Sequence, residues 1–342
     1  MNDDRYLQTL RGLACLLLVA YHVVGDDASR GLRLSEGWLR DGNDALAYLR
    51  MPLFAFLAGI VYGLRPLQGG IQGFLRVKAQ RLLLPMLVVG TLHAWLQSQV
   101  VGVNAVRFQW STLHIEPVDH FWFLEALFWI FLIVGSLESV DRCRAQGRGG
   151  RRLLNEAPAL AALWLAAVGL QLLVDLPRTL GLEGASYLLP YFVAGLAVVR
   201  LGVLSALTAP RQRAWMVVLA GLAAALALAA LGQLHANPER RTLTMLAAGT
   251  SLCLLLLALR PRTALLSRVG AGSYAIFLTH VFFTAGSRLL LERAGFTEVA
   301  VLFLSGLCCG IVGPLLLQLL AHRSPLLALL LLGESARHTV RP

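Results

Sequence analysis

Charged residues are scarce in this sequence. Only 14% of its 342 residues are Asp, Glu, Lys or Arg, whereas about a quarter of the residues of an ordinary soluble domain are charged. Hydrophobic residues make up 57% of the chain, and apolar runs such as 214–231 are long enough to cross a bilayer. These proportions exclude a soluble globular protein, and they predict an all-α polytopic membrane protein.

Paired cysteines and a cleavable signal are also lacking. The five cysteines form an odd number without paired spacing, so they predict neither a disulfide framework nor a metal site. The N-terminus opens with Asp3 and Asp4, and Arg11 interrupts its apolar stretch. Because no small-residue cleavage site follows, we expect the first span to remain as an anchor. The excess of basic residues lies in short loops, which argues against nucleic acid as a partner.

Apolar runs predict ten membrane spans. They cover residues 6–25, 45–63, 82–101, 119–138, 157–175, 185–200, 214–232, 242–259, 271–290 and 298–321. If the N-terminus is cytoplasmic, most of the 30 Lys and Arg residues fall on the cytoplasmic side, as the positive-inside rule requires. We therefore predict about ten transmembrane helices, with both termini in the cytoplasm.

No segment is long enough to form a separate soluble domain. The largest predicted loops are 26–44, 64–81, 102–118 and 139–156. Residues 1–342 are therefore predicted to form a single transmembrane domain, with 325–342 as a short cytoplasmic tail. No inverted pair of Gly- or Pro-broken helices stands out, which weakens a transporter interpretation.

Two ionisable residues lie in the first span, Arg11 near its cytoplasmic end and His22 near its outer end. Eleven helical residues complete three turns plus about 20°, so the two side chains share one face. Ionisable groups in a membrane helix usually face a protein interior or a wet cavity. Snorkelling of Arg11 and neutral packing of His22 are the structural alternatives, but the shared face favours function.

The fourth span carries an acidic residue, Glu125, at a predicted depth similar to that of His22. A carboxylate beside an imidazole orients the ring and raises its basicity, as general-base chemistry requires. The alternatives are a protonated Glu125 or a pair between Glu125 and Arg50. Residues at the start of this span are candidates on the acceptor side, although an interfacial position also explains them: Asp119, His120 and Trp122.

Basic residues gather in the predicted inner loop 73–85, which contains Arg76, Lys78 and Arg81. The positive-inside rule is sufficient to explain their spacing. The functional alternative is a phosphate clamp at the mouth of a cavity, because Arg offers paired donors to phosphate oxygens.

The ninth span contains Tyr274 and His280 in the segment GSYAIFLTH. They are six residues apart and so do not share a helix face. We interpret His280 as a buried structural hydrogen-bonding residue, and both residues as secondary to the chemistry.

Five segments, in this order, resemble the integral-membrane acyltransferase 3 family of O-acyltransferases over nearly the whole chain. They are LRGLACLLLVAYHV, RMPLFAFLAGIVYG, KAQRLLLP, HFWFLEALF and GSYAIFLTH. Two positions depart from the family pattern. Ala58 stands where the family usually has Ser, and Lys78 replaces the first Arg of a basic pair whose second member is Arg81. Lys keeps the charge but loses the bidentate fork, which leaves open whether Arg76 takes over part of the clamp.

The resemblance implies an acyltransferase that transfers groups other than amino-acyl groups. The expected reaction moves an acyl group, usually acetyl, from cytoplasmic acyl-CoA to a sugar hydroxyl, and the stand-alone members mostly modify surface or exported glycans. The family assigns the catalytic role to the residue that matches His22, as base or as acyl acceptor, and donor binding to its basic motifs. We extend donor binding to the neighbouring cations: Arg11, Arg76, Lys78 and Arg81.

From these inferences we expect acyl-CoA as co-substrate, a glycan or lipid-linked sugar as acceptor, and no permanently bound cofactor or metal. The expected location is the inner cell membrane. Acylation of an amino sugar nitrogen and succinyl transfer stay open within the enzyme class. The alternative outside that class is a transporter or flippase with Arg11, His22 and Glu125 lining its pathway.

Overall fold

The computed structural model describes residues 5–65, 67, 69–100, 109–148, 150–233 and 241–335. Within these residues the backbone is helical or irregular, with one isolated bridge between Leu113 and Glu116. Eight described helices are long and apolar enough to cross a membrane, and Ala157–Leu173 and Leu243–Leu259 are shorter apolar helices. Each predicted span coincides with one of these segments. The predicted all-α polytopic membrane class is therefore confirmed.

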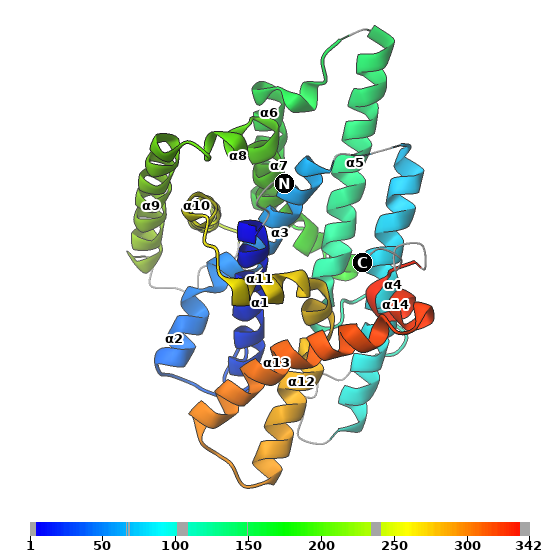
Figure 1. The fold of residues 1–342 in the computed structure, drawn as a ribbon, viewed down its shortest axis with the longest axis vertical. Helices are drawn as coiled ribbons and strands as arrows, with labels where there is room; N and C mark the ends of the chain where they lie inside the picture. The colour runs from blue at the N-terminus through cyan, green and yellow to red at the C-terminus, as the bar shows by residue number, and fades with distance from the viewer. Residues whose placement is uncertain are drawn as a thin grey trace. The chain divides into compact units, whose positions relative to one another are not determined.

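Figure 1 shows the helices coloured in the order in which they follow one another along the chain. In chain order they are α1 (Arg5–Val24), α2 (Trp38–Ala45), α3 (Ala47–Leu64), α4 (Ile71–Gln99), η1 (Asp119–Phe121), α5 (Trp122–Arg148), η2 (Leu153–Asn155), α6 (Ala157–Leu173), η3 (Thr179–Gly181), α7 (Leu182–Arg200), α8 (Val203–Ala206), α9 (Pro210–Gln233), α10 (Leu243–Leu259), α11 (Ala264–Ala271), α12 (Ser273–Arg293), α13 (Val299–Ala321) and α14 (Pro325–Leu332).

Parts of three predicted loops are helical instead. Helix α4 begins at Ile71, within the predicted loop 64–81, and α5 continues to Arg148, within the predicted loop 139–156; the predicted loop 26–44 contains most of α2. A helix forms its backbone hydrogen bonds internally, and Arg, Lys, Gln and Leu are good helix formers. A helix therefore does not have to end where its apolar run ends, and the loop prediction for residues 73–85 was wrong.

Contacts divide the chain into two compact units. The first unit consists of residues 1–47, 79–121 and 262–342, and the second of residues 48–78 and 122–261. The single domain over 1–342 stays a prediction. Of the predicted tail 325–342, α14 is described, whereas residues 336–342 lie outside the described residues.

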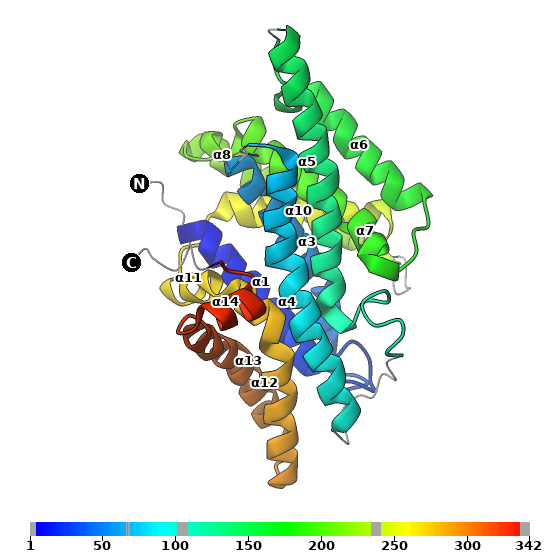
Figure 2. The same ribbon diagram turned by 90° about the vertical axis from the view of Figure 1, so that its right-hand side faces the viewer.

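In the first unit, α1 packs against α11, α12 and α13. Helices α12 and α13 lie side by side as a hairpin in both views (Figures 1 and 2). Glycine allows α1 and α11 to come very close. A Cβ atom on Gly12 would lie 1.9 Å from the carbonyl oxygen of Leu266, and one on Gly270 would lie 1.9 Å from that of Gln8. Small residues permit such backbone contact between membrane helices.

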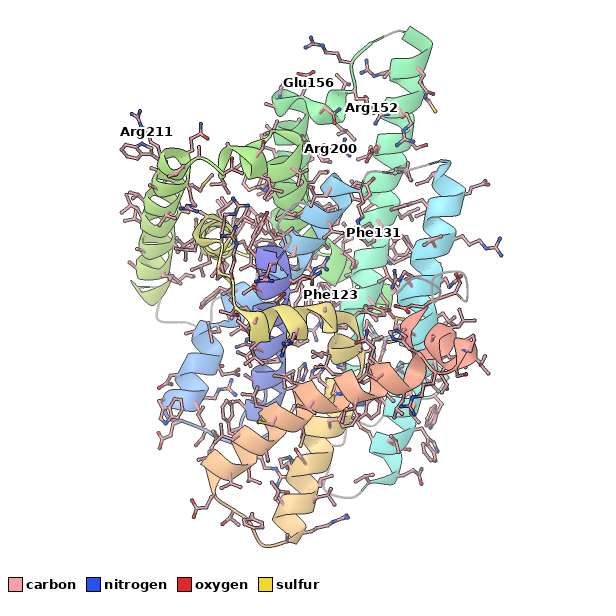
Figure 3. The ribbon with its side chains drawn as sticks, in the orientation of Figure 1. Phe123, Phe131, Arg152, Glu156, Arg200 and Arg211 are labelled. Carbon is pink, nitrogen blue, oxygen red and sulfur yellow. The ribbon has the colours of Figure 1, made fainter. Side chains whose placement is uncertain are left out.

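In the second unit, α3 and α7 approach each other in the same way, with Gly59 against the carbonyl of Phe192. A buried charge lies at one end of this pair. Glu138 is 2% exposed, and Arg200, labelled in Figure 3, donates to its two carboxylate oxygens at 3.1 and 3.2 Å. The Tyr62 hydroxyl donates to the same carboxylate at 2.7 Å. These bonds compensate the charge, which is otherwise costly to bury.

Candidate active site

Three histidine rings, each from a different element of the first unit, lie close together: those of His22, His120 and His280. The centroid of the His22 ring lies 5.3 Å from that of His120 in η1 and 4.8 Å from that of His280 in α12. The centroids of His120 and His280 are 5.0 Å apart. His280 is 0% exposed and His120 is 5% exposed, while His22 is partly buried. The cluster is therefore enclosed by protein rather than displayed on the surface.

The register between α1 and α12 brings His22 and His280 together. The Sγ atom of Cys15 lies 3.8 Å from the carbonyl oxygen of Ser273, at the start of α12. His22 and His280 each follow seven residues later in the chain, which is about 10.5 Å along a helix axis. Because both contacts exist, the two helices run parallel here. The short helix α11, packed on α1, places the start of α12 beside the middle of α1.

Backbone carbonyls fix the tautomers of the two buried rings. His120 Nε2 lies 3.0 Å from the carbonyl oxygen of Phe277, and His280 Nδ1 lies 2.8 Å from that of Ile276. A carbonyl only accepts, so each of these nitrogens carries a proton, and in a neutral ring the other nitrogen carries a lone pair. Those other nitrogens, His120 Nδ1 and His280 Nε2, are buried without a hydrogen-bond partner among the described residues.

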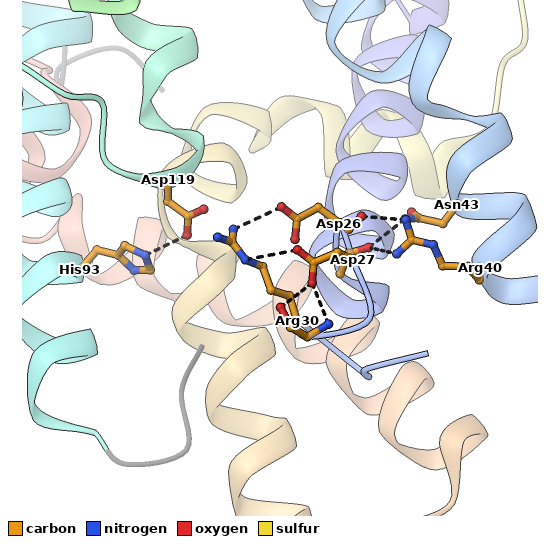
Figure 4. Close-up of polar contacts among 9 residues, drawn as sticks. Asp26, Asp27, Arg30, Arg40, Asn43, His93 and Asp119 are labelled. Carbon is orange, nitrogen blue, oxygen red and sulfur yellow. Dashed lines mark hydrogen bonds and ion pairs between the residues drawn. The ribbon is translucent and has the colours of Figure 1, made fainter. Parts of the chain in front are cut away.

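A contact between a histidine and an aspartate borders the cluster. His93, from α4, places its ring centroid 6.3 Å from that of His120, and its Nε2 lies 3.1 Å from Asp119 Oδ2 (Figure 4). The His93 side chain is 7% exposed, while the Asp119 side chain is 28% exposed. Asp119 is therefore the member of the pair that reaches solvent.

The loop after α1 is held by polar contacts that end next to His22. Arg40 Nη1 and Asn43 Nδ2 both donate to the carbonyl oxygen of Gly25 at 3.1 Å. Figure 4 shows these contacts, together with the ion pair between Arg30 and Asp26 at 3.2 Å. They tie down the C-terminal end of α1, so the backbone that carries His22 has a fixed end.

The loop before η1 is also anchored. His114 Nε2 lies 2.9 Å from Thr91 Oγ1, and partial burial lowers the pKa of His114 below its usual value of 6.5.

In the loop after α1, a hydrogen bond from the Ser29 hydroxyl, together with one from the Ser29 backbone N–H, lowers the pKa of Asp27 below 3.8. Both loops therefore favour the ionisation states that these residues have at neutral pH.

In the described part of the chain, no group of three or more His, Cys, Asp or Glu side chains is arranged to hold a metal ion. The chemistry that neutral imidazoles offer here is hydrogen bonding and proton transfer.

Of the predicted donor-side residues, Arg81 has the most defined surroundings. Its guanidinium lies 3.2 Å from Glu334 Oε1, and its carbonyl oxygen accepts a hydrogen bond from the Tyr274 hydroxyl. The other carboxylate oxygen of Glu334 lies 3.1 Å from His322 Nε2. The Arg81 side chain is still 50% exposed. The structure thus places Tyr274 with Arg81, and His280 with His22.

The three cations of α4 do not share one face. Lys78 and Arg81 are three residues apart, about 60° around the helix, whereas Arg76 lies about 140° from Arg81. Arg76 is exposed, and the Lys78 amino group lies 4.0 Å from the centroid of the Phe131 ring. Arg11 is partly buried on α1.

Glu125 and Trp122 lie in the second unit, at the start of α5. Glu125 is 5% exposed, and its Oε2 has no hydrogen-bond partner in the described part of the chain. A Cβ atom on Gly181 would lie 2.7 Å from the Glu125 Cβ, and one on Gly184 would lie 2.4 Å from the Trp122 ring. The contact between Glu125 and His22 was inferred from depth alone and stays a prediction.

Sequence reasoning did not assign His93 a role. It is an ionisable residue inside a predicted span, and that signal alone marks a candidate. The spacing between His93 and Asp119 carries no local pattern, because a loop separates α4 from η1.

The comparisons with known proteins bear on the whole of this arrangement. A family model described as an acyltransferase domain, that of the acyltransferase 3 family, matches residues 4–320. No curated protein and no solved structure shows significant similarity to the chain. The match covers α1 to α13, and it includes all three rings of the histidine cluster. The chain therefore belongs to the acyltransferase 3 family.

Proposed function

We propose that this membrane acyltransferase transfers an acyl group, expected to be acetyl, from cytoplasmic acyl-CoA to a hydroxyl of a glycan or lipid-linked sugar, with His22 as the catalytic residue. The observation that carries the proposal is the position of His22: a partly buried imidazole, next to two buried imidazoles, within the family match. A base of this kind suits the removal of a hydroxyl proton at neutral pH.

In the direct route, a nitrogen lone pair of His22 takes the proton of the sugar hydroxyl, while the oxygen of that hydroxyl attacks the thioester carbonyl. The C–S bond then breaks, and the CoA thiolate takes up the proton as the free thiol. In the covalent route, the same nitrogen attacks the thioester carbonyl, the C–S bond breaks, and the CoA thiolate leaves an acyl-imidazolium on His22. The sugar oxygen then attacks the acyl carbon, the bond to the nitrogen breaks, and the hydroxyl proton passes to the thiolate. Both routes yield one ester and one CoA thiol, and both require a neutral His22.

Arg81 and Arg11, both in the first unit, are the proposed partners of the CoA phosphates; donor binding by Lys78, in the second unit, stays a prediction. The half-exposed side chain of Arg81 supports this role, since arginine binds phosphate through paired donors. Along α1, Arg11 and His22 are separated by roughly 16 Å, a distance that an extended pantetheine arm can cover. The thioester would then reach His22 while the phosphates stay at the basic residues.

The test is acyl transfer by the purified protein in nanodiscs, supplied with acetyl-CoA labelled in the acetyl group and with glycan extracts. We expect label in a product from which mild alkali or hydroxylamine releases it, because esters are labile to both reagents and amides are stable. Label that withstands both treatments would replace the hydroxyl acceptor with an amine. Absence of transfer from any acyl-CoA, by protein that is folded and binds CoA, would overturn the proposed function.

The acceptor can be sought in cells. Surface glycans from a deletion strain should lack an acyl substituent that the parent strain carries, and mass analysis would locate it. The intact chain should restore the substituent, and a chain with His22→Ala should not.

A further inference from the structure

The histidine cluster has two lone pairs and a shortage of donors. His120 Nδ1 and His280 Nε2 are both buried without a hydrogen-bond partner among the described residues, and both rings adjoin His22. A buried acceptor without a donor is costly, commonly by about 1–3 kcal/mol. A neutral His22 has a single N–H, so it can satisfy one of these two nitrogens.

We propose that His280 is a positioning residue: a turn of the neighbouring His22 ring brings its N–H to the lone pair of His280 Nε2, and this bond fixes the tautomer in which the other nitrogen of His22 is the base. This inference rests on the proposed function of His22. The role corresponds to that of the buried carboxylate in a serine-protease triad, which orients a histidine through its N–H. Here a neutral imidazole replaces the carboxylate, so no negative charge has to be buried in the membrane.

Three observations favour His280 over His120 in this role. The His280 ring is closer to His22, at 4.8 Å against 5.3 Å. His280 is 0% exposed, so its lone pair is sealed from solvent. Its Nδ1 proton faces two carbonyl oxygens, those of Ile276 at 2.8 Å and Phe277 at 3.1 Å, so its tautomer is held from two sides.

The supporting elements are also different. His280 lies within α12, a long helix whose register against α1 is set by the contact between Cys15 and Ser273. His120 lies in η1, a single turn of 3-10 helix. A group that must hold a catalytic base in a defined orientation is more precise on a rigid element.

Spectroscopy tests the tautomers directly. In the neutral protein with ¹⁵N-labelled histidine, we expect a proton on Nδ1 of His280, a proton on Nε2 of His120, and a single tautomer for His22. In His280→Leu, the His22 signal should average over both tautomers; in His120→Leu, it should stay single. A His22 tautomer that is unchanged in His280→Leu, or that is lost only in His120→Leu, would overturn the proposal.

Kinetics of matched variants separates positioning from packing. In His280→Gln, the amide oxygen occupies the neighbourhood of Nε2 and can still accept the N–H of His22; in His280→Leu, it cannot. We expect His280→Leu to lower kcat roughly 10- to 100-fold with a nearly unchanged KM for the donor, and His280→Gln to recover most of that loss. Equal kcat values in the two variants would contradict the role.

If the Leu variants do not fold, the unmodified protein and His280→Gln still decide the question. The first must show the three predicted tautomers, and the second must keep the single tautomer of His22. If the unmodified protein transfers no acyl group, the proposed function fails on its own. The tautomers of the cluster can then still be measured, so the two failures are distinguishable.

Discussion

At the residue scale, the site depends on which atoms of a side chain are already bonded. His120 and His280 each commit one nitrogen to a carbonyl, which leaves the other as an acceptor beside His22. Arg81 commits one nitrogen to Glu334 and keeps half of its side chain exposed. These bonding patterns agree with the proposed roles, orientation and proton transfer for the buried rings and phosphate binding for the half-exposed Arg81 side chain.

A first prediction concerns donor binding. Arg81→Ala removes the proposed charge-assisted contact with a CoA phosphate, so the Kd for acetyl-CoA should rise about tenfold, equivalent to about 1.4 kcal/mol. Isothermal titration of the purified protein measures this. Arg323→Ala, at another exposed cation on the predicted cytoplasmic side, is the matched control and should leave Kd within about twofold. An unchanged Kd for Arg81→Ala would remove this residue from the donor site.

A second prediction follows from the pKa of His114, which burial lowers below 6.5. Below pH 6.5 the unfolded chain binds more protons at this residue than the folded chain does, so its contribution to stability is lost as pH falls through the folded pKa. His114→Gln removes that titration. Thermal melts between about pH 7.5 and pH 5 should show the intact protein losing more stability than the variant. Parallel curves would contradict the prediction.

At the element scale, the register of helices decides which side chains meet. The hydropathy pattern predicted the apolar part of each span because burial in lipid requires long apolar runs. The same pattern missed Ile71 to Arg81 at the start of α4 and the last turns of α5, since polar helix ends carry no apolar signal. Contact between His22 and His280 could not be predicted, because it depends on how α11 sets the start of α12 against α1.

Residues on one helix have a known relative position, whereas residues on different elements do not. Arg11 and His22 could be related to each other because they share one helix, and helix geometry is fixed. Glu125 could be related to His22 only through an estimated depth. His120 was predicted near an interface, yet the structure buries its side chain at 5% exposure, because the ring lies beside His280 and bonds to the carbonyl of Phe277.

A third prediction tests the close approach of α1 and α11. Gly12→Ala would place a Cβ atom 1.9 Å from the carbonyl oxygen of Leu266, so the helices must separate, at a cost of about 1–3 kcal/mol or more. We expect a lower melting temperature and reduced acyl transfer. Gly286→Ala is the matched control, because nothing lies within 4 Å of its Cβ position. Equal stability of the two variants would show that the contact is not as tight as described.

At the scale of the whole molecule, the chain forms two compact units, each with its own buried polar group. The histidine cluster belongs to the first unit. The second unit buries Glu138 with Arg200 and Tyr62, a network that the sequence did not suggest because its members are far apart in the chain. The first unit thus contains the proposed chemistry, while the network in the second unit is a matter of stability.

A fourth prediction addresses that network. Arg200→Leu leaves the Glu138 carboxylate with Tyr62 and a longer contact to Arg142 at 3.7 Å, so the variant should lose about 3–5 kcal/mol of stability. Adding Glu138→Gln removes the charge and should recover part of that loss. Arg211→Leu, at an exposed position, is the control. Thermal or denaturant melts that show no recovery in the double variant would contradict a charge-based explanation.

The central claim is that His22 carries acyl transfer, and one measurement tests it most directly. Purified protein in nanodiscs is given labelled acetyl-CoA and an acceptor glycan, and the rate of label transfer is compared between the intact chain, His22→Ala and His114→Gln. We predict at least about a 100-fold loss in His22→Ala with unchanged folding and CoA affinity, and near-normal transfer in His114→Gln, where a histidine of the loop before η1 is replaced. Full activity of folded His22→Ala would contradict the account.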